Sequence, residues 1–176
     1  RFPADRSKPC FLLSDGTAIS YGALEEGAAR VAGRLVAEGV RPGDRVALQA
    51  EKSPETIMIY LGVLKAGAVY LPLNSAYTKA EVDYFLGDAE PKAFVTDPPG
   101  WVAEAAKHAP LAEAVARADD DLASLIYTSG TTGRSKGAML SHGNLATNAL
   151  ALHEAWGFTK DDVLLHALPI FHTHGL

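Results

Sequence analysis

Residues 127–137 read Tyr-Thr-Ser-Gly-Thr-Thr-Gly-Arg-Ser-Lys-Gly, and the rest of the chain can be placed relative to this stretch. From Thr128 to Gly133 every residue is Gly, Ser or Thr, so no apolar side chain can anchor the loop to a core. Directly before it, residues 122–127 form a short, mostly apolar run that is typical of a buried strand. Backbone N–H groups, hydroxyls and the ammonium of Lys136 are groups that surround phosphate oxygens and offset their charge. A strand followed by such a loop predicts a site for an oligophosphate.

The loop differs from the Walker A pattern, which requires Gly, four residues and then Gly-Lys-Ser/Thr. Here Ser135 precedes Lys136, Gly137 follows it, and no helix is predicted directly after the lysine. The loop therefore cannot use a helix N-terminus to bind phosphate, as a P-loop does. A solvated Gly/Ser-rich linker is the alternative interpretation. The adjoining apolar strand and the lysine beyond the second glycine favour the phosphate site.

Strand-like and helix-like segments alternate along the chain. This alternation indicates βαβ units and an α/β fold, with a parallel sheet and helices on both of its faces. A hairpin is predicted around the Asp-Gly pair at 15–16. Ser20, Ser53 before Pro54, Thr78 with Glu81, and Ser141 with Asn144 are predicted to begin helices. Strands are expected at 11–13, 18–20, 46–50, 68–73, 92–96, 122–127 and 163–168, with a short apolar segment at 138–140. Helices are expected at 21–38, 54–66, 78–86, 101–108 and 141–156, with a break at the Pro-Pro-Gly of 98–100.

The run Thr-Ser-Gly-Thr-Thr-Gly-x-x-Lys-Gly, preceded by Tyr127, resembles the phosphate-loop signature of the adenylate-forming (ANL) superfamily. That superfamily contains acyl-CoA synthetases, luciferases and peptide-synthetase adenylation domains. Residues 168–176, Leu-Pro-Ile-Phe-His-Thr-His-Gly-Leu, resemble the next motif of acyl-CoA synthetases. Residues 67–74 and the two-histidine form of this second motif are most similar to malonyl-CoA synthetases. The resemblance implies that 1–176 is the N-terminal part of an AMP-binding (adenylation) domain. The remainder of that domain and a C-terminal domain would lie outside this sequence.

The resemblance implies an ATP-dependent acid–CoA ligase, with a small malonate-like acid, ATP and coenzyme A as its ligands. Residues of the loop would hold the β- and γ-phosphates: Thr128, Ser129, Gly130, Thr131, Thr132, Gly133 and Lys136. His172 would lie near the acid carboxylate and the α-phosphate, and His174 would line the acid pocket and suit a second carboxylate. Lys136 and His172 are thus the expected catalytic residues. Mg²⁺ is implied too, with its carboxylate ligand beyond Leu176.

The position of the two motifs supports a shared site. Each motif follows a predicted strand, and ligands of open α/β sheets bind beyond the carboxyl ends of the strands. For either histidine, a loop residue without a ligand is the alternative. Between residues 103 and 121 the chain is short and Ala-rich, whereas the superfamily usually has a longer stretch. Either the natural loop is short or residues are missing there.

Several functions remain compatible with these residues. Fatty- and aryl-acid CoA ligases share the same phosphate loop, so a fatty or an aryl acid is the alternative to malonate. A non-catalytic nucleotide-binding fragment is the alternative of another class. Residues 1–176 alone are expected to be inactive, because the resemblance places later motifs and a catalytic lysine beyond them.

Composition limits the remaining classes. Of the 176 residues 48% are hydrophobic, which fits a globular domain with a real core. The net charge of −5 gives no basic surface for nucleic acid. The only cysteine, Cys10, excludes an internal disulfide and favours a reducing, cytoplasmic location. No apolar run reaches membrane-spanning length, and no Cys/His spacing predicts a metal site.

Overall fold

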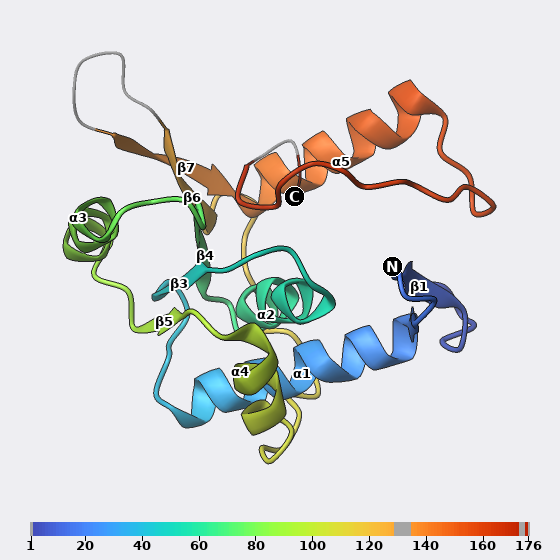
Figure 1. Cartoon of the computed structure of the whole chain (residues 1–176), viewed down its shortest axis with the longest axis horizontal. Helices are drawn as coiled ribbons and strands as arrows, with labels where there is room; N and C mark the ends of the chain where they lie inside the picture. Colours follow the sequence, from blue (N-terminus) through green and yellow to red (C-terminus); the bar gives the residue numbers. More distant parts are fainter. Residues whose placement is uncertain (1, 129–134, 173–174, 176) are drawn as a thin grey trace.

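The computed structural model describes residues 2–128, 135–172 and 175. Its centre is a five-stranded sheet of order β5-β3-β4-β6-β7 (Figure 1). The strands are β3 (Arg45–Gln49), β4 (Val69–Leu73), β5 (Ala93–Val95), β6 (Leu122–Thr128) and β7 (Lys136–Ser141). Strand β3 is parallel to β4 and β5, and β4 is parallel to β6, whereas β7 is antiparallel to β6. The predicted parallel sheet is therefore confirmed, with one antiparallel edge strand added.

Local capping signals place most helices where the sequence predicts them. The hairpin of β1 (Pro9–Leu12) and β2 (Ala18–Ser20) leads into α1 (Tyr21–Ala37), whose first turn is capped by the Ser20 hydroxyl. Ser53 caps α2 (Pro54–Lys65), and Thr78 forms a capping box with Glu81 at the start of α3 (Lys79–Ala89). These short polar side chains satisfy N–H groups that the helix itself leaves unpaired.

Two hydrophobic clusters cover the two faces of the sheet. On one face, Val46, Leu48 and Tyr70 pack with residues of α1, α2 and α4 (Pro98–Ala105). On the other, Ala47 and Leu71 pack with α3. Neighbouring residues of one strand thus serve opposite cores, as the alternation of side chains along a strand requires. Figure 1 shows α3 on one side of the sheet and α1, α2 and α4 on the opposite side. The expected helices on both faces are confirmed.

The predicted break at 98–100 is wrong, because Pro98, Pro99 and Gly100 form the first turn of α4. Asp97 is the N-cap, and its carboxylate accepts the Gly100 N–H at 3.2 Å. Proline is tolerated at this end of a helix because its missing N–H would have no helical partner there.

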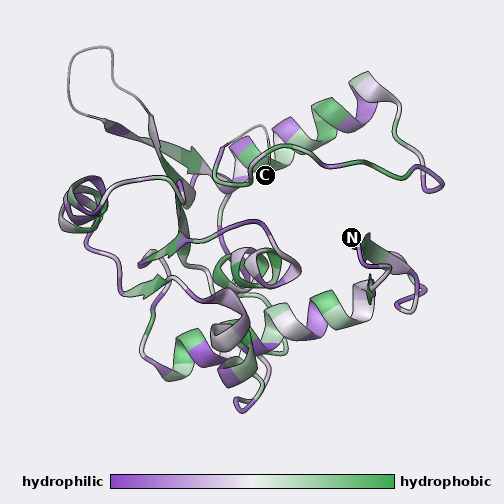
Figure 2. Ribbon diagram, viewed as in Figure 1, coloured by the Kyte–Doolittle hydropathy of each residue, from purple (hydrophilic) through white to green (hydrophobic). Residues whose placement is uncertain are grey.

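The predicted strand at 163–168 is also wrong. After α5 (His142–Trp156), residues 163–168 have no regular secondary structure (Figure 1). Val163, Leu164 and Leu165 are 82%, 62% and 92% exposed, although Figure 2 colours much of this run as hydrophobic. A strand needs a hydrogen-bonded neighbour, and no described residue pairs with this run. The apolar composition predicted a buried strand, but these residues are exposed and no described residue pairs with them.

Candidate phosphate loop and adjoining segments

The Gly/Ser/Thr run connects β6 to β7 in the sequence, and these two strands form an antiparallel hairpin whose described ends, Thr128 and Lys136, are called here the two ends of the hairpin tip. The last register pair before the tip joins Thr128 to Lys136, and the Thr128 hydroxyl donates to the Lys136 carbonyl at 3.4 Å. Lys136 was expected within a loop, but it is the first residue of β7. Ser129, Gly130, Thr131, Thr132 and Gly133 lie outside the described residues. The structure therefore brings the two ends of the predicted site together across one hairpin.

Thr128 and Lys136 lie at the carboxyl edge of the parallel strands. Strand β6 runs in the same direction as β4, so its last residue, Thr128, is at that edge. Because β7 runs in the reverse direction, its first residue, Lys136, is there too. This is the edge at which ligands of open α/β sheets bind.

The Lys136 side chain is exposed, and no ion pair within the described ranges includes it. Its ammonium can therefore meet an incoming anion without first breaking an internal pair. In contrast, Arg34 is tied to Glu38 and lies over the Trp101 ring, which leaves its guanidinium occupied.

Helix α3 holds both ends of the hairpin tip. The Tyr84 hydroxyl donates to the Ser135 carbonyl at 3.2 Å, and the Tyr127 hydroxyl donates to the Asp88 carboxylate. The Tyr127 ring packs against Phe85 with their centroids 4.4 Å apart. Burial, followed by the hydrogen bond to Asp88, raises the pKa of the Tyr127 phenol.

Sequence reasoning singled out Tyr127 as part of the motif but missed Tyr84 and Asp88. The spacing of four residues between Tyr84 and Asp88 puts them on one side of a helix, and this spacing was the only feature of the sequence that could have indicated a shared role. Their partners lie 51 and 39 residues away in sequence, so the contacts themselves had no local signature.

His172 lies on a separate compact turn. Its carbonyl accepts the Gly175 N–H at 2.9 Å, and its ring lies 4.9 Å from the Phe171 ring. Gly175 is needed here because a Cβ would come within 2.1 Å of the Pro169 carbonyl oxygen. Ile170 is buried and fixes the turn, whereas His172 is exposed. No hydrogen bond or ion pair between described residues joins His172 to Thr128 or Lys136. His174 lies outside the described residues.

Lys52 supports the chain that leads to this turn. Its ammonium donates to the carbonyl of His166 at 2.6 Å and to that of Leu168 at 3.2 Å. His166, expected inside a strand, is part of the irregular run instead.

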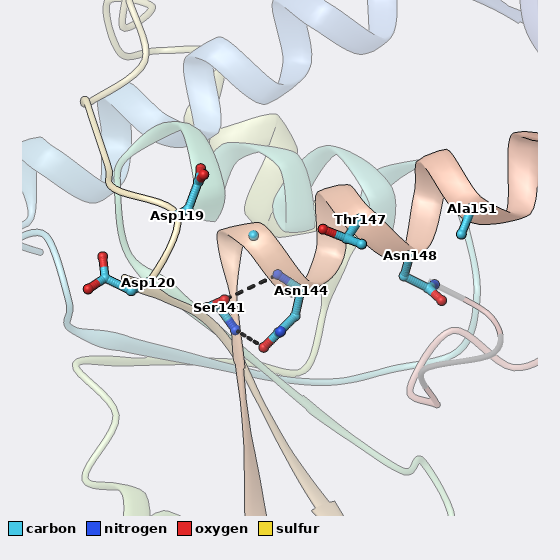
Figure 3. Close-up of a pocket in the computed structure, with 8 residues that line it drawn as sticks. Asp119, Asp120, Ser141, Asn144, Thr147, Asn148 and Ala151 are labelled. Carbon is cyan, nitrogen blue, oxygen red and sulfur yellow. Dashed lines mark hydrogen bonds between the residues drawn. The ribbon is translucent and has the colours of Figure 1, made fainter.

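An open depression lies at the start of α5 (Figure 3). It is lined by Asp119, Asp120, Ser141, Gly143, Asn144, Thr147, Asn148 and Ala151. The first N–H groups of α5 are already used: His142 donates to the Asp121 carbonyl, Gly143 to the Asp119 carbonyl and Asn144 to the Ser141 hydroxyl. With these donors occupied and two carboxylates on its rim, the depression is poorly suited to phosphate.

The described part of the chain contains no group of three or more His, Cys, Asp or Glu side chains that could hold a metal ion. A search of the same residues finds no helix with the length and apolar character to cross a membrane.

Comparisons with known proteins agree with this geometry. The family model described as AMP-binding enzyme matches residues 2–176. A feruloyl-CoA synthase of an Amycolatopsis species is 38% identical over 92% of this chain, and an Arabidopsis thaliana oxalate–CoA ligase is 32% identical over 90% of it. The ATP-bound crystal structure of MatB from Rhodopseudomonas palustris is 49% identical over 99% of this chain, with a TM-score of 0.90.

The chain spans only part of these proteins: 36% of the feruloyl-CoA synthase and 40% of MatB. Within that span the similarity is continuous from the N-terminal hairpin to the His172 turn, since the family match covers nearly every residue. On this evidence the chain belongs to the AMP-binding enzyme family, the adenylate-forming superfamily to which its Tyr127–Gly137 stretch points.

Proposed function

We propose that this chain is the N-terminal part of the adenylation domain of an AMP-forming acid–CoA ligase. The observation that carries the proposal is the hairpin tip. A run of hydroxyls and glycines connects two paired strands whose ends, Thr128 and Lys136, lie at the carboxyl edge of the sheet, and no ion pair between described residues includes the Lys136 ammonium. Similarity to CoA ligases and to an ATP-bound structure supports ATP as the phosphate ligand.

In the proposed reaction the carboxylate oxygen of the acid attacks the α-phosphorus of ATP. The bond from the α-phosphorus to the bridging oxygen breaks, and pyrophosphate leaves with that oxygen and its electron pair. The thiol of coenzyme A then attacks the acyl carbon of the adenylate, loses its proton and releases AMP.

The residues of the loop act on the leaving group. Thr128, Lys136 and the residues between them would donate to the β- and γ-phosphate oxygens, and each charge-assisted hydrogen bond contributes about 1.5–3 kcal/mol. The part of this energy that accelerates the reaction is the part realised only as charge develops on pyrophosphate. Mg²⁺ would offset phosphate charge, but its expected carboxylate ligand is not among the described residues, and no step here depends on it.

We propose malonate as the acid, with His172 near the reacting carboxylate and His174 near the second one. The support is the likeness of residues 67–74 and of the two-histidine motif to malonyl-CoA synthetases. An exposed imidazole at His172, on a turn fixed by Ile170, can approach a ligand without rearrangement of the core. Ferulate and oxalate are the competing acids, because relatives named for them are 38% and 32% identical. A cytoplasmic location is part of the same proposal.

Pyrophosphate release by the full-length protein tests the reaction. Lys136→Ala should slow release by about 100-fold, the cost of losing one donor to a developing anion. Lys107→Ala is the matched control, because Lys107 is also exposed but lies just beyond α4 and pairs with Glu104. Equal rates for Lys136→Ala and the control would refute the proposed role of the loop.

A substrate screen tests the acid. Malonate, methylmalonate, acetate, oxalate, ferulate, coumarate and a fatty acid should be compared at equal concentration. Malonate is expected to give the highest kcat/KM. Preference for ferulate or a fatty acid would remove the malonate assignment and leave the ligase reaction intact.

A further inference from the structure

Helix α3 presents two polar groups to the hairpin tip, one for each of its ends. Tyr84 and Asp88 are four residues apart and therefore lie on the same side of the helix. Tyr84 donates to the carbonyl of Ser135, the residue just before Lys136. Asp88 accepts from Tyr127, the residue just before Thr128. The two contacts bracket the loop 128–136.

Of the side chains in these contacts, that of Tyr127 is largely removed from water, whereas Tyr84 is partly buried and Asp88 is exposed. Tyr127 is only 6% exposed, and its ring packs between Phe85, at 4.4 Å, and Tyr84, at 6.4 Å between centroids. A hydrogen bond from a phenol to a carboxylate is charge-assisted and stronger than one between neutral groups. The aromatic packing restricts where the hydroxyl can lie, so the bond fixes position as well as adding stability.

On its β4 side, this part of β6 has little strand pairing. Strand β4 is in register with β6 only at Tyr70 and Ser124, where the Ser124 hydroxyl also donates to the Tyr70 carbonyl at 2.9 Å. Residues 125–128 extend beyond that point, paired only with β7. Tyr127 still packs in one cluster with Leu71 and Leu73 of β4, and the two hydrogen bonds from α3 add to this packing in positioning the hairpin tip.

We infer that Tyr84 and Asp88 are positioning residues, which hold the two ends of the hairpin tip so that the loop meets the β- and γ-phosphates of a nucleotide. The inference rests on the proposed function of the loop. It predicts an effect confined to the phosphate tail: loss of either contact should weaken binding of ATP, which carries those phosphates, and spare AMP, which lacks them.

The test measures affinity for ATP and for AMP in the full-length protein with Tyr84→Phe and Tyr127→Phe, each of which removes one hydroxyl and keeps the ring. Each should weaken ATP binding about 3- to 10-fold, as expected for one lost hydrogen bond. AMP affinity should stay within about twofold, which also shows that the variant is folded. Asp88→Asn removes the charge and should reproduce the effect of Tyr127→Phe.

Tyr77→Phe is the matched control. Tyr77 belongs to the same aromatic cluster, with its ring 4.9 Å from Phe85, but its hydroxyl has no hydrogen-bond partner within the described ranges. Lys136→Ala, measured in parallel, distinguishes a failure of the phosphate role of the loop from a failure of the positioning role of Tyr84 and Asp88. If Lys136→Ala leaves ATP affinity unchanged, the phosphate role of the loop is wrong. If it weakens ATP binding while Tyr84→Phe and Tyr127→Phe behave like Tyr77→Phe, the positioning inference alone is overturned.

Discussion

The close approach of α1 and α2 depends on the missing side chain of Gly62. A Cβ at this position would lie 2.3 Å from Val31 Cγ1, 2.6 Å from Val31 Cβ and 2.9 Å from the Ala28 carbonyl oxygen. Carbon atoms in ordinary contact are about 3.5–4.0 Å apart. Since Val31 is fully buried and β-branched, it cannot rotate out of the way. Gly62→Ala should therefore force the two helices apart.

The size of the effect follows from two opposing contributions. Overpacking of a core typically costs about 1–3 kcal/mol, and a clash with Cβ and backbone atoms belongs at the upper end. Alanine in a helix interior is intrinsically better than glycine by about 1 kcal/mol. The net loss of stability should be about 2 kcal/mol, or a fall in Tm of about 4–8 °C for a domain of this size.

Urea unfolding followed by circular dichroism measures this difference, and Gly87→Ala supplies the control. Gly87 is also within a helix, α3, but it is exposed and a Cβ there would meet nothing within 4 Å. Gly87→Ala should therefore stabilise the protein by about 0.5–1 kcal/mol. If Gly62→Ala is as stable as Gly87→Ala, the helices are not packed as closely as the structure indicates.

Three further predictions concern other contacts. Hydrogen bonds from the Thr78 hydroxyl and, to a smaller extent, from the Thr78 N–H lower the pKa of Glu81. The stabilisation that these bonds give is therefore present above the unfolded pKa of about 4.3, and it is lost as the pH falls through the lower pKa of the folded state. The Tm difference between wild type and Glu81→Gln should therefore shrink on acidification from pH 6 to about pH 3; a constant difference would contradict this account. Ser124→Ala should reduce the free energy of unfolding by about 1 kcal/mol, measured by urea titration, because a buried hydrogen bond to β4 is lost; an unchanged midpoint would argue against that bond. Lys52→Met should raise KM for the acid about threefold and leave KM for ATP unchanged, because it releases the chain leading to His172; equal changes in both constants would indicate a general loss of structure.

The sequence predicted well the features that depend on interactions between residues close together in the chain. Ser53 before Pro54 defines the start of α2, and the Thr78 capping box defines that of α3, because these side chains bond N–H groups within the same turn. The parallel sheet followed from the alternation of such units. The Pro-Pro-Gly of 98–100 was predicted as a break, because proline interrupts the interior of a helix but is also found in its first turn. Asp97, as the N-cap, places both prolines in the first turn of α4.

Features that depend on distant residues could not be predicted. Strand β7 begins at Lys136 because it pairs with β6, and its own burial does not alternate. Residues 163–168 have the composition of a strand, but their conformation depends on a neighbour rather than on themselves. The contacts of Tyr84 and Asp88 cross from a helix to a hairpin far along the chain. The two ends of the candidate site could thus be identified from sequence, whereas their support could not.

The hairpin tip and the chain leading to the His172 turn are hydrogen-bonded to different parts of the fold. Helix α3 supports the hairpin tip, and Lys52, just before α2, supports the chain leading to the turn. On the proposed function this separation makes the protein modular. Substitutions in the His172 turn and in the chain leading to it could change which acid is bound, without altering the contacts that position the loop for the nucleotide. Relatives named for substrates as unlike as ferulate and oxalate are what such independent evolution would leave behind.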